Sequence, residues 1–267
     1  MTERYTIDQI RAIGQPPSIT GRRSAEHWTA SLYLRIFSPY LTKLLLPTGI
    51  SANGVTILMI FTGWAAAASL LIPGIPGALL AVVFGQLQML VDASDGEVAR
   101  VRGTSGAAGV FLDKIGHYTT EALIALALGM RAAGGFDAAT TMVDGMVSGW
   151  VFAGALLALI LVMNKALNDM AESTRYLTGL PKIVDSDENS APLSGGLGTL
   201  RAAARFVPFH RIYHSVEMTL IIFVAAVGDA LTGDLVVTRI LLLALVPLAA
   251  LSTLGHAVAI LSSRRLK

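Results

Sequence analysis

Six stretches of mostly apolar residues follow one another along the chain, each close to the ~20 residues that a helix needs to cross a membrane. A Gly- and Pro-containing turn separates the first two, and a Gly-rich hinge separates the second from the third. This pattern predicts six transmembrane helices. Their expected positions are residues 53–72, 77–98, 109–130, 145–166, 212–232 and 236–262.

The segment at residues 27–46 is also apolar, but polar or helix-breaking residues interrupt it. These residues are His27, Arg35, Pro39 and Lys43. A segment of this kind is too broken to span a membrane and predicts an amphipathic helix along the cytoplasmic interface. The expected fold class is therefore an all-α integral membrane protein, with six transmembrane helices and an N-terminal interfacial amphipathic helix.

Two regions follow from this reading of the chain. Residues 1–50 are expected to form a cytoplasmic N-terminal arm that includes the interfacial helix, and residues 51–267 the six-helix transmembrane domain. Residues 179–199 have the composition of turns and predict a mobile loop between the fourth and fifth helices.

The composition agrees with a membrane protein. Apolar residues make up 54% of the 267 residues and charged residues only 14%, against about 25% in an average soluble domain. These values argue against an ordinary soluble enzyme, and the net charge of +2 argues against nucleic-acid binding. The absence of cysteine excludes disulfides, thiolate metal sites and cysteine nucleophiles. The first 25 residues lack an apolar core, so no cleavable signal peptide is expected.

The positive charges predict the orientation. With six spans and the N-terminus inside, 18 of the 20 Lys and Arg residues fall on the cytoplasmic side. Only Arg131 and Arg239 fall on the other side. Because cytoplasmic loops carry an excess of Lys and Arg, both termini are expected to be cytoplasmic.

Acidic residues gather where the second and third predicted helices meet. Asp92 and Asp95 are three residues apart on one helix, and Asp113, His117 and Glu121 follow at intervals of four on the next. These spacings place each set on one helix face, and the short turn makes the helices antiparallel neighbours. Carboxylates gathered in this way repel one another unless a cation lies among them. Oxygen ligands favour Mg²⁺, Mn²⁺ or Ca²⁺, so the pattern predicts a divalent-cation site for a phosphorylated substrate.

The same segment resembles the signature of the CDP-alcohol phosphotransferase (CDP-alcohol phosphatidyltransferase) family, D-x2-D-G-x2-A-R-x8-G-x3-D-x3-D. Seven of its eight positions match at full spacing over residues 92–117, and His117 stands where the family has its last Asp. The matching residues are Asp92, Asp95, Gly96, Ala99, Arg100, Gly109 and Asp113. Asn53 and Thr56 also resemble the P-N-x-x-T stretch of the family's first span, although Ala52 replaces the usual Pro.

The resemblance implies a reaction in which a CDP-alcohol donates its phospho-alcohol portion to a second alcohol and CMP leaves. It implies two divalent cations, Mg²⁺ or Mn²⁺, with Asp92, Asp95 and Asp113 as metal ligands. The nucleotide would be bordered by small motif residues and the start of the first span. The residues concerned are Asn53, Thr56, Gly96, Ala99 and Gly109. Arg100 either contacts the substrate phosphate or pairs with a neighbouring carboxylate.

His117 is the departure from the family pattern, and its role stays open at this point. It either acts as the base that activates the acceptor hydroxyl, ligates a metal, or marks a degenerate site with little turnover. Asp113 and His117 are therefore the candidate catalytic residues, and His117 is also a candidate ligand. Glu97 lies at a variable motif position and is expected to face water or to pair with Arg100 or Arg102.

Further polar residues stand at the start of the fifth predicted helix. They are Arg201, Arg205, His210, Arg211, His214 and Glu217. They form either a pocket for an anionic acceptor or headgroup, or ordinary positive flanks of a membrane span. His256 is expected to be a packing histidine, and Gly145-x3-Gly149 predicts a helix-contact face within the chain or in a homodimer.

The expected partners are a CDP-linked lipid donor, most directly CDP-diacylglycerol, an alcohol acceptor and membrane lipid. The acceptor is not specified, but the basic fifth-helix segment favours a phosphorylated alcohol. The expected location is a bacterial or archaeal inner membrane, with the site facing the cytoplasm. Two other functions stay open: a catalytically weak CDP-lipid-binding paralogue, and a cation or proton transporter that uses the intramembrane carboxylates. The acids lie at one interface rather than at mid-membrane, which counts against transport.

Overall fold

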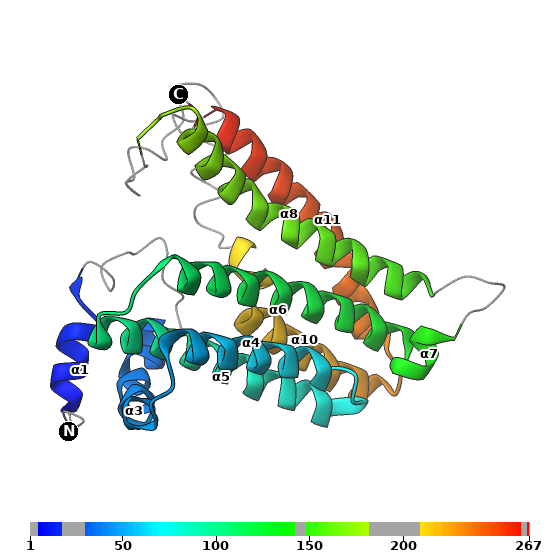
Figure 1. Cartoon of the computed structure of the whole chain (residues 1–267). Coiled ribbons are helices and arrows are strands. Elements are labelled where there is room, and N and C mark those ends of the chain that lie inside the picture. The colour runs from blue at the N-terminus through cyan, green and yellow to red at the C-terminus, as the bar shows by residue number, and fades with distance from the viewer. Residues whose placement is uncertain (1–4, 18–29, 142–147, 182–208, 263–265, 267) are drawn as a thin grey trace. The chain divides into compact units, whose positions relative to one another are not determined.

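The computed structural model describes residues 5–17, 30–141, 148–181, 209–262 and Leu266. Every regular element in these residues is helical, which confirms the all-α fold class. Figure 1 shows the helices in chain order. The N-terminal ones are α1 (Ile7–Gly14), the π-helical turn η1 (Ala30–Leu34), α3 (Arg35–Leu45) and the 3₁₀ turn η2 (Leu46–Thr48).

A long helix is present at each of the six predicted positions. These helices are α4 (Ala52–Ser69), α5 (Gly74–Arg102), α6 (Ala107–Ala133), α8 (Gly149–Leu177), α10 (Ser215–Thr232) and α11 (Val236–Ser262). The short α7 (Phe136–Thr140) and the 3₁₀ turn η3 (Phe209–Tyr213) lie between them. Most of the predicted loop, from residue 182 on, lies outside the described residues, as do residues 27–29 of the predicted interfacial segment.

Among the described residues, five helices have the length and apolar composition of membrane spans, namely α4, α5, α8, α10 and α11. The remaining long helix, α6, has 27 residues but carries Asp113, Lys114, Glu121 and Arg131. These helices fit an integral membrane protein, and the assignment of α6 as a sixth span stays a prediction.

The chain forms two compact units. The first contains Met1–Ile72 and Pro76–Thr120, and the second contains Pro73–Ile75 and Glu121–Lys267. The boundary between them falls within α6. The predicted division at residue 50 is not tested by this grouping.

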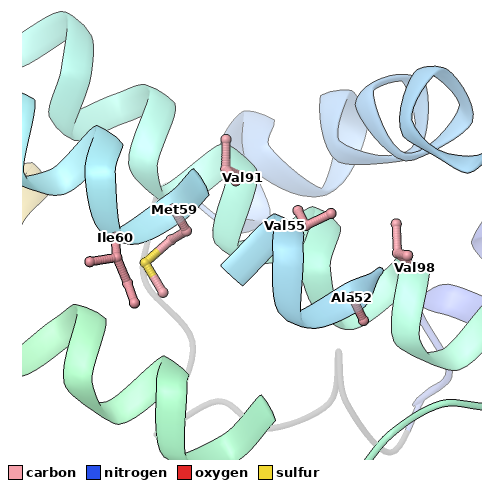
Figure 2. Packing of buried hydrophobic residues seen from close by; sticks show 6 residues of the cluster. All are labelled: Ala52, Val55, Met59, Ile60, Val91 and Val98. Atoms are coloured by element: carbon pink, nitrogen blue, oxygen red, sulfur yellow. The ribbon is translucent and has the colours of Figure 1, made fainter. Parts of the chain in front are cut away.

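The first unit has its apolar core between α4 and α5. Figure 2 shows four side chains of α4 and two of α5 that form a buried cluster. They are Ala52, Val55, Met59, Ile60, Val91 and Val98. The helix α4 also approaches α6 closely, because a Cβ atom at Gly63 would lie 2.1 Å from Oγ1 of Thr120. Only glycine leaves room for this contact, which holds α4 against the helix that carries Asp113 and His117.

The ends of α4 and α5 are set by residues with specific roles. Ser51 caps α4 by accepting a hydrogen bond from the Gly54 N–H at 3.1 Å. The helix α5 ends at Gly103, whose φ of 64° is the left-handed conformation that favours glycine. The Thr104 N–H then bonds the Ala99 carbonyl, and α6 begins at Ala107. The tight turn confirms the short connection predicted between the two helices that carry the acidic residues.

The helix α3 buries two polar side chains and exposes several apolar ones. Ser38 and Thr42 are fully buried, whereas Ile36, Phe37 and Leu44 are exposed. An exposed apolar face suits contact with lipid. The position of α3 on a membrane surface stays a prediction.

In the second unit, α8 packs along α11, as Figure 1 shows. The helices α6 and α8 approach most closely where Gly129 faces Gly154, since a Cβ atom on Gly154 would lie 2.7 Å from the Gly129 Cα. No helix contact is found at the described end of the expected Gly145-x3-Gly149 face. Gly145 lies outside the described residues, and within the described part of the chain a Cβ atom at Gly149 would meet nothing within 4 Å.

Candidate metal and nucleotide site

Three of the predicted ligands converge in the first unit. Asp92 projects from α5, and Asp113 and His117 project from α6 one helical turn apart. One ligand atom of each residue lies within 4.8 Å of the others. The Nε2 atom of His117 lies 3.4 Å from Oδ1 of Asp92 and 3.4 Å from Oδ1 of Asp113. Two antiparallel helices thus bring together acidic groups that are 21 positions apart in the sequence.

Asp95 lies beside this group rather than within it. Its carboxylate is close enough to Asp92, Asp113 and Thr56 to interact with them electrostatically. Its Oδ2 atom is buried and accepts no hydrogen bond from the residues that the structure describes. A buried carboxylate oxygen without a partner is costly. A cation bound between Asp92, Asp95 and Asp113 would remove that cost.

The donor set fits a divalent cation. Three carboxylates supply the hard oxygen ligands that Mg²⁺ and Mn²⁺ prefer, and neutral imidazole suits Mn²⁺ better than Mg²⁺. The side chains of Asp92 and His117 are about a quarter exposed, at 23% and 24%, and that of Asp113 is 44% exposed. The group is therefore accessible from one side, and Asp113 is its most accessible member.

The residues expected around the nucleotide lie in the same unit. A Cβ atom at Gly109 would lie 3.3 Å from Oδ1 of Asn53, so the start of α4 faces the start of α6. Thr56, one turn after Asn53, is buried and donates a hydrogen bond to the Ala52 carbonyl at 3.2 Å. Its neighbour across the helix interface is Asp95. The first turns of α4 therefore lie beside the acidic group.

The two remaining nucleotide candidates lie on α5. Ala99 packs against the apolar cluster between α4 and α5. The guanidinium of Arg100 lies over Gly96, because a Cβ atom there would come within 3.0 Å of Nη1. Arg100 Nε donates to the Gly14 carbonyl at 2.7 Å. Arg100 thus has a structural contact, and its other nitrogens extend across the small surface of Gly96.

The expectation that Glu97 faces water is wrong, although its charge interacts with Arg100, one of its two expected partners. This side chain does not face water, since it is fully buried and accepts hydrogen bonds from Gln15, Ser38 and Thr42. The sequence contains only a weak signal: Ser38 and Thr42 are four residues apart and share one face of the predicted helix, but nothing local relates that face to Glu97. Arg102, the other expected partner, instead donates to the backbone carbonyls of Leu46 and Ile50.

The second unit holds a separate ionic cluster. Glu121 is 3% exposed, and its Oε1 atom lies 3.0 Å from Lys165 Nζ and 3.0 Å from His214 Nδ1. Lys165 is not among the predicted candidates, because it lies near the end of an apolar stretch, where positive flanks of membrane spans are common. Arg201 and Arg205 lie outside the described residues. His256 confirms a packing role, since its two ring nitrogens contact Asn164 at 2.7 Å and Asn168 at 3.1 Å.

The chain was compared with curated proteins and with models of protein families. None of the curated proteins compared with the chain matches it significantly. Residues 49–175 match the family model described as CDP-alcohol phosphatidyltransferase. The matched segment contains Asp92, Asp95, Asp113 and His117 together with the nucleotide candidates from Asn53 to Gly109. The resemblance noted in the signature is thereby confirmed, and residues 49–175, just under half of the chain, form the segment (the family domain) that is similar to CDP-alcohol phosphatidyltransferases.

Proposed function

We propose that this protein transfers a phosphatidyl or similar phospho-alcohol group from a CDP-alcohol, most directly CDP-diacylglycerol, to a second alcohol in phospholipid biosynthesis. The observation that carries the proposal is the convergence of Asp92, Asp113 and His117 within 4.8 Å inside the family domain. A donor with lipid chains also explains why a site for phosphate groups is built on helices of membrane-spanning composition.

In this proposal Asp92, Asp95 and Asp113 hold two divalent cations, Mg²⁺ or Mn²⁺, and His117 Nε2 stays free of metal. When bound, these ions neutralise the diphosphate and stabilise the negative charge that develops during transfer. Asn53, Thr56, Gly96, Ala99 and Gly109 border the cytidine. Arg100 has nitrogens beyond Nε with which to approach a phosphate oxygen across Gly96.

The reaction exchanges one phosphorus–oxygen bond for another. The acceptor hydroxyl oxygen forms a bond to the phosphorus that carries the donated alcohol. The bond from that phosphorus to the bridging oxygen breaks, and its electron pair leaves with CMP. We assign the hydroxyl proton to His117 Nε2, because the carboxylates of Asp92 and Asp113 at 3.4 Å stabilise a positive charge on this atom. Asp113, the most exposed member of the group, is the second candidate for this role.

The acceptor in this proposal is a phosphorylated alcohol. The sequence that leads into α10 is basic, with Arg201, Arg205 and Arg211. Such groups favour an anionic substrate over a neutral one. The proposal further places α6 as a sixth span, α3 on the membrane surface and both termini in the cytoplasm, in accordance with the distribution of Lys and Arg. A homodimer stays a prediction from the family resemblance.

The decisive experiment measures CMP release by the purified protein in lipid nanodiscs, with CDP-diacylglycerol and Mg²⁺ or Mn²⁺. Acceptors are offered as matched pairs, such as glycerol and glycerol phosphate, or inositol and inositol phosphate. We expect CMP release with one phosphorylated member and none without metal. Binding of CDP-diacylglycerol without CMP release from any acceptor would identify a catalytically weak paralogue. Cation flux into liposomes without CMP release would instead identify a transporter.

A further inference from the structure

Glu97 lies inside the metal-binding signature, yet its side chain points away from the metal site. It lies five positions after Asp92, which places it about 140° around the α-helix from that residue. The carboxylate is 0% exposed and accepts hydrogen bonds from Ser38 Oγ at 2.5 Å and Thr42 Oγ1 at 2.6 Å. Both donors belong to α3, which precedes the family domain in the chain.

Gln15 completes this group from the end of α1. Its Nε2 atom donates to Glu97 Oε1 at 2.8 Å and to the Arg35 carbonyl at 2.9 Å. That carbonyl is available because Pro39, four residues later, has no N–H with which to bond it. A single amide nitrogen thus joins the Arg35 carbonyl of α3 to the carboxylate of Glu97 on α5. Three donors suit an ionised carboxylate, which only accepts hydrogen bonds.

Other contacts join the same partners over two turns of α5. Ser94 Oγ lies 3.4 Å from the Ser38 carbonyl, and Arg100 Nε donates to the Gly14 carbonyl at 2.7 Å. Arg102 donates to the Leu46 carbonyl at 2.8 Å. Ser94 and Glu97, on the side of α5 that faces away from Asp92, therefore bind the described part of the N-terminal arm, and the long side chains of Arg100 and Arg102 extend this contact.

We propose that Glu97 is a positioning residue that fixes the metal-bearing turn of α5 against the N-terminal arm. The arm has an exposed apolar face at Ile36, Phe37 and Leu44, so lipid contact on one side and Glu97 on the other hold α3 in place. A shift of α5 would change the separation of Asp92 from Asp113 and His117, which come from a different helix. The inference rests on the proposed function where it concerns turnover, but not where it concerns metal binding.

The experiment compares Glu97→Gln and Glu97→Ala with the wild-type chain in nanodiscs. Hydrogen exchange of α1 and α3 reports whether the arm stays bound, and Mn²⁺ affinity is measured by electron paramagnetic resonance. The matched control is Gln88→Ala, because Gln88 is buried on the same helix but its amide faces Met59 at 3.6 Å. A double variant, Ser38→Ala with Thr42→Val, removes two donors without changing the family domain.

We expect Glu97→Ala to raise exchange in α1 and α3 at least tenfold and to weaken Mn²⁺ binding about tenfold. Glu97→Gln should change hydrogen exchange and Mn²⁺ affinity less than Glu97→Ala does. The Ser38 and Thr42 double variant should also show faster exchange and weaker Mn²⁺ binding than the wild type. If Glu97→Ala shows faster exchange but unchanged Mn²⁺ affinity, Glu97 does not position the metal site. If exchange is unchanged in both Glu97→Ala and the double variant, Glu97 does not hold the arm. Absence of CMP release by the wild type would contradict the proposed function alone, since both of these readouts would still be measurable.

Discussion

The imidazole Nε2 of His117 lies 3.4 Å from Oδ1 of Asp113, the carboxylate one helical turn earlier on α6. The same nitrogen lies 3.4 Å from Oδ1 of Asp92 on α5. One atom of the residue that departs from the family pattern therefore faces both helices of the acidic group. Its chemistry can be separated from its geometry by substitutions that keep one property and remove the other.

Three substitutions of His117 distinguish proton acceptance from metal ligation. His117→Asp restores the family's residue and should keep CMP release within about tenfold of the wild type, because Asp performs both roles. His117→Gln places an amide near Nε2 that ligates weakly but accepts no proton, and it should lose about 100-fold or more. His117→Ala should lose at least as much.

The measurement is the initial rate of CMP release at saturating donor, together with Mn²⁺ affinity. If His117→Gln keeps activity while His117→Ala loses it, the residue acts as a ligand and not as the base. If His117→Ala turns over like the wild type, the residue has no chemical role.

The carboxylates carry the second prediction. Asp92→Asn and Asp95→Asn each remove a charge that the cations require, so each should reduce CMP release by about 1,000-fold and weaken Mn²⁺ binding. Chelation by EDTA should abolish the activity of the wild type, and Mn²⁺ should restore it. The control is Asp137→Asn, at an exposed position on α7, which should change neither quantity. Normal Mn²⁺ affinity in Asp92→Asn would contradict the assigned site.

The hydrophobic pattern predicted the six long helices well, because continuous apolar stretches fix both the type and the approximate length of an element. The helix ends were less predictable, since α5 and α8 continue several residues beyond their apolar parts into polar turns. The predicted six-span topology places only Arg131 and Arg239 on the non-cytoplasmic side. Both donate to backbone carbonyls, Arg131 to Gly74 at 2.7 Å and Arg239 to Ala132 at 3.0 Å.

The acidic group could be predicted because its residues are three or four positions apart on each helix and so share one helix face. The turn between the two helices has only a few residues, so the helices must pack side by side. Glu97 could not be placed in the same way. Its partners Gln15, Ser38 and Thr42 are 55 to 82 residues away, and no local rule relates them to α5. The ionic cluster of Glu121, Lys165 and His214 joins three helical segments and escaped prediction for the same reason.

The contact of Gly63 with Thr120 yields a prediction about stability. Gly63→Ala would place a methyl group 2.1 Å from the Thr120 Oγ1 position, which forces α4 and α6 apart. We expect a loss of about 1–3 kcal/mol in the free energy of unfolding, measured by thermal or denaturant unfolding in detergent. Addition of Thr120→Ala should recover part of this loss, because the hydroxyl and methyl groups are removed.

Gly255→Ala is the matched control for Gly63→Ala. Gly255 is exposed within α11, and a Cβ atom there would meet nothing within 4 Å of the described residues. Since alanine favours helices over glycine, this variant should be as stable as the wild type or more stable. Equal stability of Gly63→Ala and Gly255→Ala would show that α4 and α6 do not approach as closely as the structure has them.

The buried Glu121 carries the last prediction. Its Oε1 atom lies 3.0 Å from Lys165 Nζ and 3.0 Å from His214 Nδ1, so Glu121→Ala removes the carboxylate that pairs with Lys165 in a largely buried position. Breaking a buried ion pair from one side costs about 3–5 kcal/mol, whereas removal of both partners costs less than the sum of the single losses. The midpoint of thermal unfolding should therefore fall further for Glu121→Ala than for Glu121→Ala combined with Lys165→Met. If the double variant is instead less stable by the sum of the two single effects, Glu121 and Lys165 are not coupled.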